Sequence, residues 1–404
     1  SLPTFYTVAT AAGALLAGIL FLLAPVIAAF YNSPQLVPIV QCLSVTLFLG
    51  GVRSVSQSLM TKHLLFQRLT IIEGICGLLS ASVAVYLAWR GYGAWSLVIN
   101  LVLASVLQTL VVTVAVRPKY TLRPDMAVVK KTLRWGTPMI GSSVLWKLYD
   151  NADYLIIGKL AGKEALGFYT VAFRLATLVN EKIGAVVSRV SFPTFAALQH
   201  DHSRVAAHWF SITRKSALVS FPILTMLIVA AEDIVGVLLG AKWLPSVHLL
   251  RLLCIVGALR VLTPVTINLL PALGRSDLAF RYTLMNAIFM PASFFLACVW
   301  NGPTGVAFAW LLVFPSIALY LIHHALRLTG THWTPYVKNL RLPMLSSIAL
   351  AAGMAPALLF VANAPVRLII SALCGGAAFL MTMLASTEGR ALLPQQLLRL
   401  WPRR

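Results

Sequence analysis

Long apolar runs, separated by short polar segments, follow one another along the whole chain. A helix that crosses a membrane needs about 20 mostly apolar residues, and these runs approach or reach that length. The predicted spans are 8–30, 36–60, 69–89, 94–116, 135–157, 165–187, 216–239, 245–272, 280–300, 304–323, 343–361 and 366–385. The pattern therefore predicts an all-α polytopic membrane protein with 12 visible transmembrane helices.

The composition agrees with that interpretation. Of the 404 residues, 59% are hydrophobic and 11% are charged, whereas a soluble domain carries about 25% charged residues. The five cysteines lie in apolar stretches without a CxxC pair, as expected for small buried residues. These features exclude a soluble enzyme, a secreted disulfide scaffold and a disordered chain.

The net charge of +21 is distributed unevenly between the two sides of the predicted membrane. If Ser1 is cytoplasmic, 21 of the lysines and arginines outside the spans lie on the cytoplasmic side and five on the other. Cytoplasmic loops of membrane proteins carry an excess of positive charge. The distribution predicts that both visible termini are cytoplasmic. No basic stripe is interleaved with aromatic residues, so no nucleic-acid partner is expected.

A shift of 207 residues aligns the chain with itself. Identical residues that then coincide include Gly50 with Gly257 and Arg53 with Arg260. The first four spans would thus correspond to spans seven to ten, which implies a repeat of six spans with the same membrane direction. Chance similarity between apolar segments is the alternative. The repeat predicts 6 + 6 + 2 helices in two pseudo-symmetric lobes, with two further helices before Ser1.

This repeat also predicts the domain organisation. The remainder of an N-terminal lobe would contain four helices, and a basic cytoplasmic loop would connect it to a six-helix C-terminal lobe. Two extra helices and a basic tail would follow. The corresponding ranges are 1–117, 118–134, 135–323 and 324–404.

Charged side chains inside the predicted spans are the candidates for function. A charge at the centre of a span costs roughly 2.5–3.5 kcal/mol on insertion scales, so it is expected to face a wet cavity or a partner. The cations in the spans are Arg53, Lys147, Arg174, Lys182, Arg251 and Arg260, and the carboxylates are Glu73, Asp150, Asp153 and Glu181. The excess of cations predicts a cavity for an anionic head group. The alternative is that the charges pair and hold helices together.

Motifs of enzymes are absent from the sequence. It contains neither a GxxxxGK[ST] phosphate-binding loop nor an HExxH zinc motif nor a nucleophile elbow. The segment His200-Asp201-His202 could suggest a metal, but a site would need further ligands. We therefore expect no enzymatic activity, no cofactor and no metal.

The segment 151–160, NADYLIIGKL, is followed by ALGFY at 165–169 and by Arg174. Together with SFP at 191–193 and LGRSD at 273–277, it resembles the polysaccharide-synthesis flippases. These belong to the multidrug/oligosaccharidyl-lipid/polysaccharide exporter superfamily. The resemblance extends over essentially the whole chain.

The resemblance implies a 14-helix transporter of the bacterial inner membrane that works by alternating access. Its substrate would be an undecaprenyl-diphosphate-linked oligosaccharide for exopolysaccharide, O-antigen or capsule synthesis, and a polymerase and export machinery would be partners. We expect the diphosphate to contact Arg174, Arg53, Arg260, Lys147 and Arg251. Asp150, Asp153 and Glu181 would tune these cations or bind sugar hydroxyls.

Three alternatives remain open at this point. A multidrug or organic-cation antiporter of the same superfamily would need an acidic cavity. A non-transporting scaffold would keep its function without the cavity charges. A membrane glycosyltransferase or polymerase would need a carboxylate-rich catalytic loop or a large polar outer loop.

Overall fold

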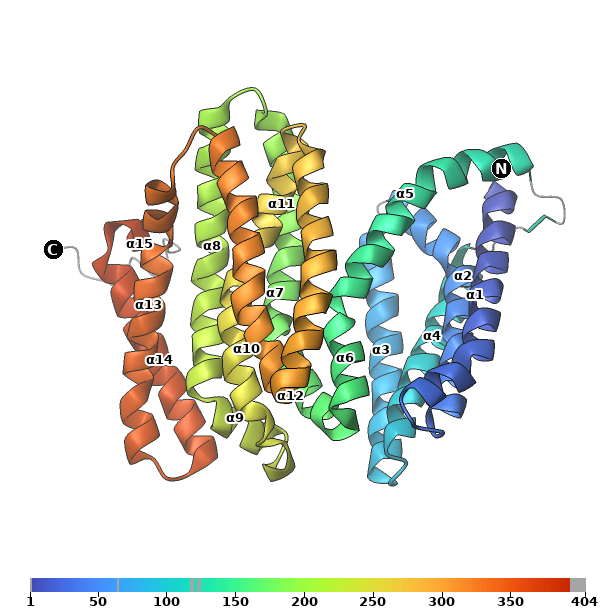
Figure 1. Cartoon of the computed structure of the whole chain (residues 1–404), viewed down its shortest axis with the longest axis horizontal. Helices are drawn as coiled ribbons and strands as arrows, with labels where there is room; N and C mark the ends of the chain where they lie inside the picture. Colours follow the sequence, from blue (N-terminus) through green and yellow to red (C-terminus); the bar gives the residue numbers. More distant parts are fainter. Residues whose placement is uncertain (1, 64, 117–119, 122–124, 393–404) are drawn as a thin grey trace. The chain divides into compact units, whose positions relative to one another are not determined.

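The computed structural model describes residues 2–63, 65–116, 120–121 and 125–392, and this part of the chain is helical with short turns (Figure 1). The helices are α1 (Leu2–Phe30), α2 (Leu36–Lys62), α3 (Phe66–Trp89), α4 (Ala94–Val116), α5 (Met126–Asp150), α6 (Ala152–Leu160), α7 (Gly162–Leu198), α8 (His202–Val229), α9 (Ala231–Leu238), α10 (Ser246–Arg260), α11 (Thr263–Ala272), α12 (Ser276–Leu328), α13 (Trp333–Phe360), α14 (Ala364–Ala385) and α15 (Thr387–Leu392). A 3-10 helix, Ala241–Trp243, lies between α9 and α10. The helices form two compact units, Ser1–Ser143 and Val144–Arg404.

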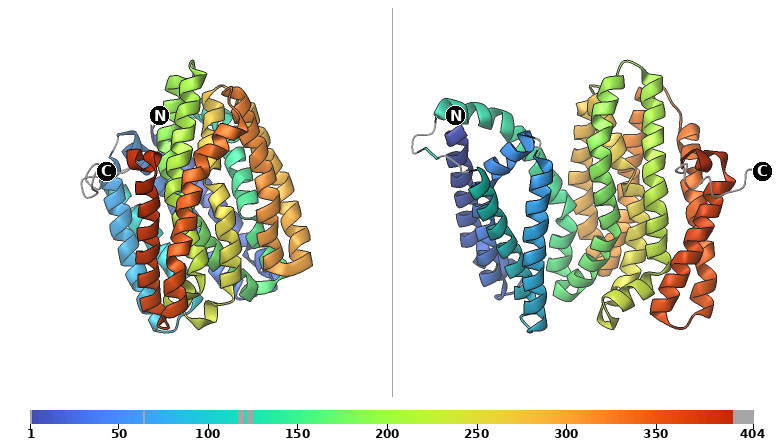
Figure 2. Two further views of the ribbon diagram at one scale, coloured as in Figure 1. Left: turned by 90° about the vertical axis from the view of Figure 1, so that its left-hand side faces the viewer. Right: turned by 180° about the vertical axis from the view of Figure 1, so that it is seen from behind.

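The first unit is a bundle of α1 to α4, in which α2 packs against α1 and α4, and α3 packs against α4 (Figure 2). The α1–α2 contact is close because glycines face each other. A Cβ atom on Gly51 would lie 2.6 Å from the carbonyl oxygen of Ala9 and 2.9 Å from the Cα of Gly13. Small residues let membrane helices approach until their backbones touch, so this pair sets the α1–α2 distance.

Gly51→Leu is expected to destabilise the first unit by about 1–3 kcal/mol, the usual cost of overpacking. The cause is that the atoms in the way are backbone atoms of α1 and cannot turn aside. Gly50→Leu is the matched control, since a Cβ there meets nothing within 4 Å. Thermal unfolding of the purified full chain would measure both variants. Equal melting temperatures for the two variants would contradict the close-contact explanation.

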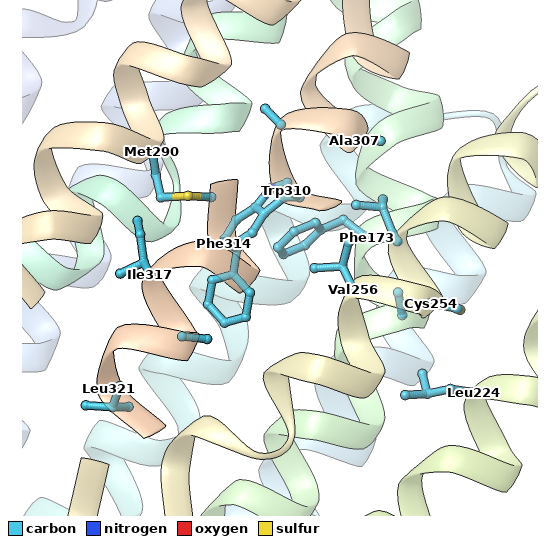
Figure 3. Packing of buried hydrophobic residues seen from close by; sticks show 14 of the residues in the cluster. Phe173, Leu224, Cys254, Val256, Met290, Ala307, Trp310, Phe314, Ile317 and Leu321 are labelled. Atoms are coloured by element: carbon cyan, nitrogen blue, oxygen red, sulfur yellow. The ribbon is translucent and has the colours of Figure 1, made fainter. Parts of the chain in front are cut away.

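The second unit contains a large apolar core (Figure 3). α7 packs against α8, α10 and α11, and α12 packs against α6, α10 and α11. The side chains of Trp209, Tyr169, Phe195, Phe294 and Trp310 are almost completely buried there. α12 reverses direction at Asn301 and Gly302, whose backbone angles are non-helical, so it forms two arms. The core therefore joins several helices that are distant in sequence.

α13 and α14 pack on each other and, through α13, on α8. Ion pairs tie this segment to the bundle at two positions. Arg367 of α14 donates two hydrogen bonds to the carboxylate of Asp233 on α9, one of 2.7 Å, and the Asp233 side chain is only 5% exposed. Arg214 of α8 contacts Glu388 of α15 at 2.8 Å. The last two long helices are thus an integral part of the second unit.

Nine helices or helix pairs within the described residues are long and apolar enough to cross a membrane. They are α1 to α4, α8, the α10–α11 pair, α12, α13 and α14. α5 and α7 are absent from that set; both carry charged residues in their predicted spans. An all-helical, multi-pass membrane fold is thereby confirmed, while the count of 12 spans stays a prediction.

Residues with positive φ angles mark turns in both units. Asn32 and Gly240 have positive φ angles of 50° and 91° shortly before α2 and α10. Gly93 before α4 and Gly302 between the arms of α12 both have φ 52°. The lobes of 6 + 6 + 2 helices remain a prediction.

Candidate functional site

A cavity of about 730 Å³ lies within the second unit. Its walls come from α5, α7, α10, α11 and α12. The charged lining residues are Lys147, Asp150, Arg174, Glu181 and Arg260, and the aromatic ones are Trp146, Tyr149, Phe173, Tyr282, Trp310 and Phe314. Three cations against two carboxylates give the lining a net positive charge, and aromatic rings form a large part of its surface.

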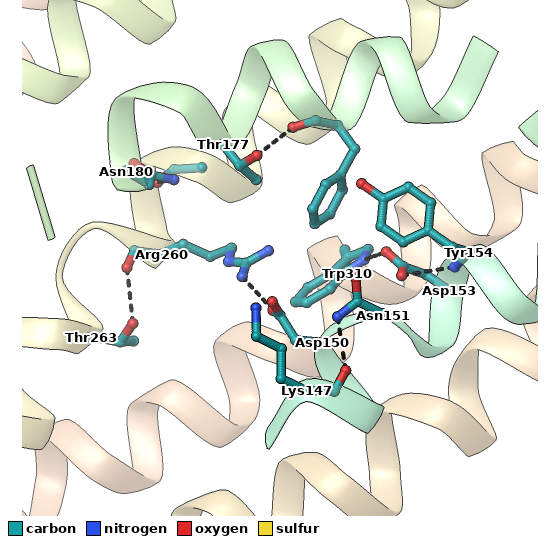
Figure 4. Close-up of polar contacts among 12 residues, drawn as sticks. Lys147, Asp150, Asn151, Asp153, Tyr154, Thr177, Asn180, Arg260, Thr263 and Trp310 are labelled. Atoms are coloured by element: carbon teal, nitrogen blue, oxygen red, sulfur yellow. Dashed lines mark hydrogen bonds and ion pairs between the residues drawn. The ribbon is translucent and has the colours of Figure 1, made fainter. Parts of the chain in front are cut away.

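Arg260, the last residue of α10, lies beside Asp150 in this cavity (Figure 4). Its Nη2 donates a 3.0 Å hydrogen bond to Oδ1 of Asp150, the last residue of α5. Its guanidinium carbon lies 4.5 Å from the ring centre of Trp310, 5.4 Å from that of Phe173 and 6.0 Å from that of Phe314. Aromatic faces attract a guanidinium electrostatically. Arg260 is therefore held by one ion pair and by three rings.

The ring of Trp310 is itself fixed by hydrogen bonds on the side of the buried core. Its Nε1 donates to Oδ2 of Asp153 at 3.2 Å and to the hydroxyl of Tyr169 at 3.1 Å. The Tyr169 hydroxyl donates to the same Asp153 oxygen at 2.6 Å, and the Tyr154 backbone N–H donates to the other at 2.8 Å. Asp153 is completely buried, and its hydrogen bond helps to fix the Trp310 ring in the cavity wall.

The helix break at Asn151 separates the two aspartates. Asn151 has φ −119° and ψ 9°, and this conformation separates α5 from α6. Its side-chain amide donates a 2.8 Å hydrogen bond to the backbone carbonyl of Lys147. An asparagine that bonds to the preceding turn competes with regular helical bonding. Asp150 consequently lines the cavity while Asp153 is buried behind it.

Five of the eight residues predicted from the sequence line this one cavity: Lys147, Asp150, Arg174, Glu181 and Arg260. Lys147, Arg174 and Glu181 are exposed. The ammonium of Lys147 lies 4.9 Å from the ring centre of Trp146. Figure 4 shows Lys147 beside the Asp150–Arg260 pair.

The other three predicted residues lie elsewhere. Asp153 is behind the cavity wall, as described above. Arg53 belongs to the first unit, where it donates a hydrogen bond to Gln108. Arg251 donates a 3.0 Å hydrogen bond to Glu232 and lines a separate pocket of about 400 Å³. Within the second unit, Arg251 and Arg260 line different pockets.

Sequence reasoning missed the aromatic wall of the cavity. Trp310 carried a usable signal, because it lies in the middle of the predicted span 304–323, whereas tryptophans in membrane proteins favour the interfaces. Phe173 and Phe314 resemble any other core aromatic in the sequence. The side-chain amide of Asn180 donates a 3.0 Å hydrogen bond to the Gly257 carbonyl. No sequence pattern distinguishes Asn180 either.

The His200-Asp201-His202 segment has a structural role in the part of the chain that the structure describes. Asp201 precedes α8, and its side chain accepts a 3.0 Å hydrogen bond from the backbone N–H of Arg204, as helix-capping residues do. Its other oxygen lies 3.2 Å from the Arg204 guanidinium. No three His, Cys, Asp or Glu side chains among the described residues converge as metal ligands would.

Comparisons of sequence identify relatives that are named as biosynthesis proteins. Residues 1–248 match the family model described as polysaccharide biosynthesis protein. The chain is 30% identical over 390 residues to the teichuronic acid biosynthesis protein TuaB of Bacillus subtilis, covering 95% of this chain and 80% of that protein. It is 26% identical to the lipopolysaccharide biosynthesis protein WzxC of Escherichia coli, covering 86% and 71%.

Comparisons of structure identify the fold. The lipid II flippase MurJ in an inward closed conformation superposes with a TM-score of 0.78 at 15% identity, covering 97% of this chain and 84% of that one. An inward-facing multidrug resistance transporter of the MATE family gives a TM-score of 0.65 at 13% identity, covering 80% of each chain. With this transporter fold, and with a family model that matches more than half of its length, the chain belongs to the polysaccharide biosynthesis protein family.

Proposed function

We propose that the protein is a flippase that moves lipid-linked oligosaccharide repeat units across the membrane for surface polysaccharide synthesis. The observation that carries this proposal is the cationic, aromatic-walled cavity with Arg260 at its centre. An anionic diphosphate suits the cations, and sugar rings suit the aromatic walls. Relatives named for teichuronic acid and lipopolysaccharide biosynthesis support the same substrate class.

In this proposal the lipid carrier is undecaprenyl diphosphate, and Arg260, Arg174 and Lys147 bind its phosphates. Arginine binds phosphate in a bidentate manner, and lysine binds it as a point charge. Asp150 and Glu181 balance these cations and accept hydrogen bonds from sugar hydroxyls. The glycan would become exopolysaccharide, O-antigen or capsule. A polymerase and export machinery would take it further.

Alternating access within a 6 + 6 + 2 helix arrangement is the proposed mode of transport. The protein would lie in the bacterial inner membrane with both ends of this chain on the cytoplasmic side, as its distribution of lysine and arginine indicates. The protein would act as a transporter and not as an enzyme.

The rival function, a multidrug or organic-cation antiporter, is less well supported. A cationic drug needs an excess of carboxylates, whereas the cavity lining has three cations and two carboxylates. The similarity to a MATE transporter, at 13% identity, concerns the fold alone.

Depletion of the full-length protein tests the function. We expect undecaprenyl-linked complete repeat units to accumulate in lipid extracts while surface polymer is lost, because the units would be made but not moved. Mass spectrometry of the extracts would measure the accumulation and identify the glycan. Re-expression of the wild-type protein is the control. A normal lipid pool with new sensitivity to cationic drugs would instead favour the antiporter.

A further inference from the structure

We infer that Trp146 is the stacking surface for the first sugar of the substrate, the pyranose that is bonded directly to the diphosphate. This role rests on the proposed function and adds a specificity-determining residue to it. With such a surface, the cavity distinguishes a glycosylated diphosphate lipid from the bare polyprenyl diphosphate that carries no sugar.

Among the described lining residues of the cavity, Trp146 is the aromatic one with an exposed ring. Its side chain is 44% exposed. The side chains of the other five are at most 8% exposed. They are Tyr149, Phe173, Tyr282, Trp310 and Phe314. Because a ligand stacks only on a ring face that it can reach, the five buried rings shape the wall and Trp146 provides the surface.

The position of Trp146 differs from that of most exposed tryptophans in membrane proteins, which collect at the two membrane interfaces. Position 146 is the midpoint of the predicted span 135–157, eleven residues from each end. At a rise of 1.5 Å per residue it is about 16 Å from either end of a helical span. Its partner is therefore to be expected in the cavity and not at the membrane surface.

A cation lies against this ring. The ammonium of Lys147 is 4.9 Å from the ring centre of Trp146, and Figure 4 shows Lys147 beside the Asp150–Arg260 pair. In the proposed function Lys147 binds a phosphate of the diphosphate, and the first sugar is bonded to that diphosphate through its anomeric oxygen. A sugar next to a phosphate at Lys147 thus lies within reach of the ring, which stays exposed with the ammonium in contact.

Asp150 adds an acceptor beside the ring. It is four residues after Trp146 on α5, a spacing that places two side chains on the same face of a helix. Arg260 donates to Oδ1, and a carboxylate accepts hydrogen bonds on both of its oxygens. A sugar hydroxyl can therefore bind Oδ2 while the ion pair stays in place. A pyranose has an apolar C–H face and a rim of hydroxyls, which match the negative face of an indole beside a carboxylate.

Binding measurements on the purified full chain test this role. The probes are farnesyl diphosphate and the same lipid with glucose, galactose or N-acetylglucosamine on its diphosphate. We expect the wild type to bind at least one glycosylated lipid more tightly than farnesyl diphosphate. Trp146→Leu should reduce that preference about tenfold, or by about 1.4 kcal/mol, which corresponds to burial of roughly 55 Å² of apolar surface. The affinity for farnesyl diphosphate should stay unchanged.

Two further variants make the measurement specific. Trp146→Phe keeps a smaller ring at the same position and should retain part of the preference. Trp300→Leu is the matched control, because Trp300 is also exposed but lies on α12 outside the cavity lining, and it should leave the preference unchanged. Since the Trp146 side chain is exposed, its replacement should leave the folded core intact.

Equal losses of affinity for bare and glycosylated lipids in Trp146→Leu would overturn the assignment of the sugar to Trp146, and so would a fully retained preference. A wild type that binds farnesyl diphosphate but gains nothing from any of the three sugars would also overturn it. In each of these cases diphosphate-lipid binding persists and the proposed function stands. A wild type that binds none of the four probes would instead contradict the proposed function.

Discussion

Arg260→Ala is expected to reduce polysaccharide export by roughly 100-fold, because truncating one partner of a largely desolvated charge pair costs about 2–5 kcal/mol in binding, and this pair is partly buried. The variant removes the cation that three rings and Asp150 hold at the cavity centre. Arg260→Lys should recover part of the activity, since lysine keeps the charge but cannot bind phosphate in a bidentate manner. Surface polymer, normalised to the amount of protein in the membrane, is the quantity to measure.

Two further arginine variants make this experiment specific. Arg204→Ala is the control, because Arg204 pairs with Asp201 three residues away on an exposed helix start. Arg251→Ala tests the assignment of the site itself, since Arg251 lies in a different pocket although the sequence pattern groups it with Arg260. Export near the wild-type level in Arg251→Ala would agree with the structure. A loss as large as that of Arg260→Ala would show that the site extends beyond the cavity.

Trp310→Ala is expected to lower the free energy of unfolding by about 3–5 kcal/mol, as large-to-small substitutions in packed cores do. Trp310 is 1% exposed and touches Phe173, Phe294 and Phe314. The substitution also removes the donor to Asp153 and the ring beside Arg260. Denaturation of the full chain in mixed micelles would measure the change.

Trp300→Ala is the matched control for this prediction. It lies on the same helix, but its side chain is 76% exposed, so its loss should hardly change the free energy of unfolding. Trp310→Phe keeps an aromatic ring beside Arg260 but loses the indole N–H and part of the ring volume. Trp310→Phe should therefore lower the free energy of unfolding by about 1–3 kcal/mol, the range for a buried acceptor that loses its hydrogen-bond donor. Comparable destabilisation by Trp300→Ala and Trp310→Ala would contradict the description of the core.

The apolar helices that are long enough to cross a membrane, among the described residues, could be predicted from the sequence because length and hydropathy define them. The contacts between them could not, since Arg260 finds Asp150 across 110 residues. Helical geometry nevertheless predicts that Arg251 and Arg260 lie apart. Arg251 and Arg260 are nine residues apart on α10, and at 3.6 residues per turn this spacing places them on opposite sides of the helix.

The break at Asn151 shows a second limit of sequence reasoning. On a continuous helix Asp153 would lie about a third of a turn from the face that carries Lys147 and Asp150, and a role in the cavity would be reasonable. Asn151 ends α5 one residue before α6 begins, and the carboxylate of Asp153 then lies among Tyr169, Trp310 and the Tyr154 backbone. A local hydrogen bond of one asparagine thus changed the role of a neighbouring charge.

The ion pair between Asp233 and Arg367 also has a consequence for biogenesis. The two residues are 134 positions apart, and a chain is synthesised from its N-terminus. When α9 is first synthesised, the carboxylate of Asp233, which is nearly buried in the folded protein, lacks this partner, and the partner arrives only with α14. Until then the second unit carries a poorly satisfied charge. Insertion of α14 therefore completes the folding of helices made much earlier, and chains terminated before it are expected to be substrates for membrane quality control.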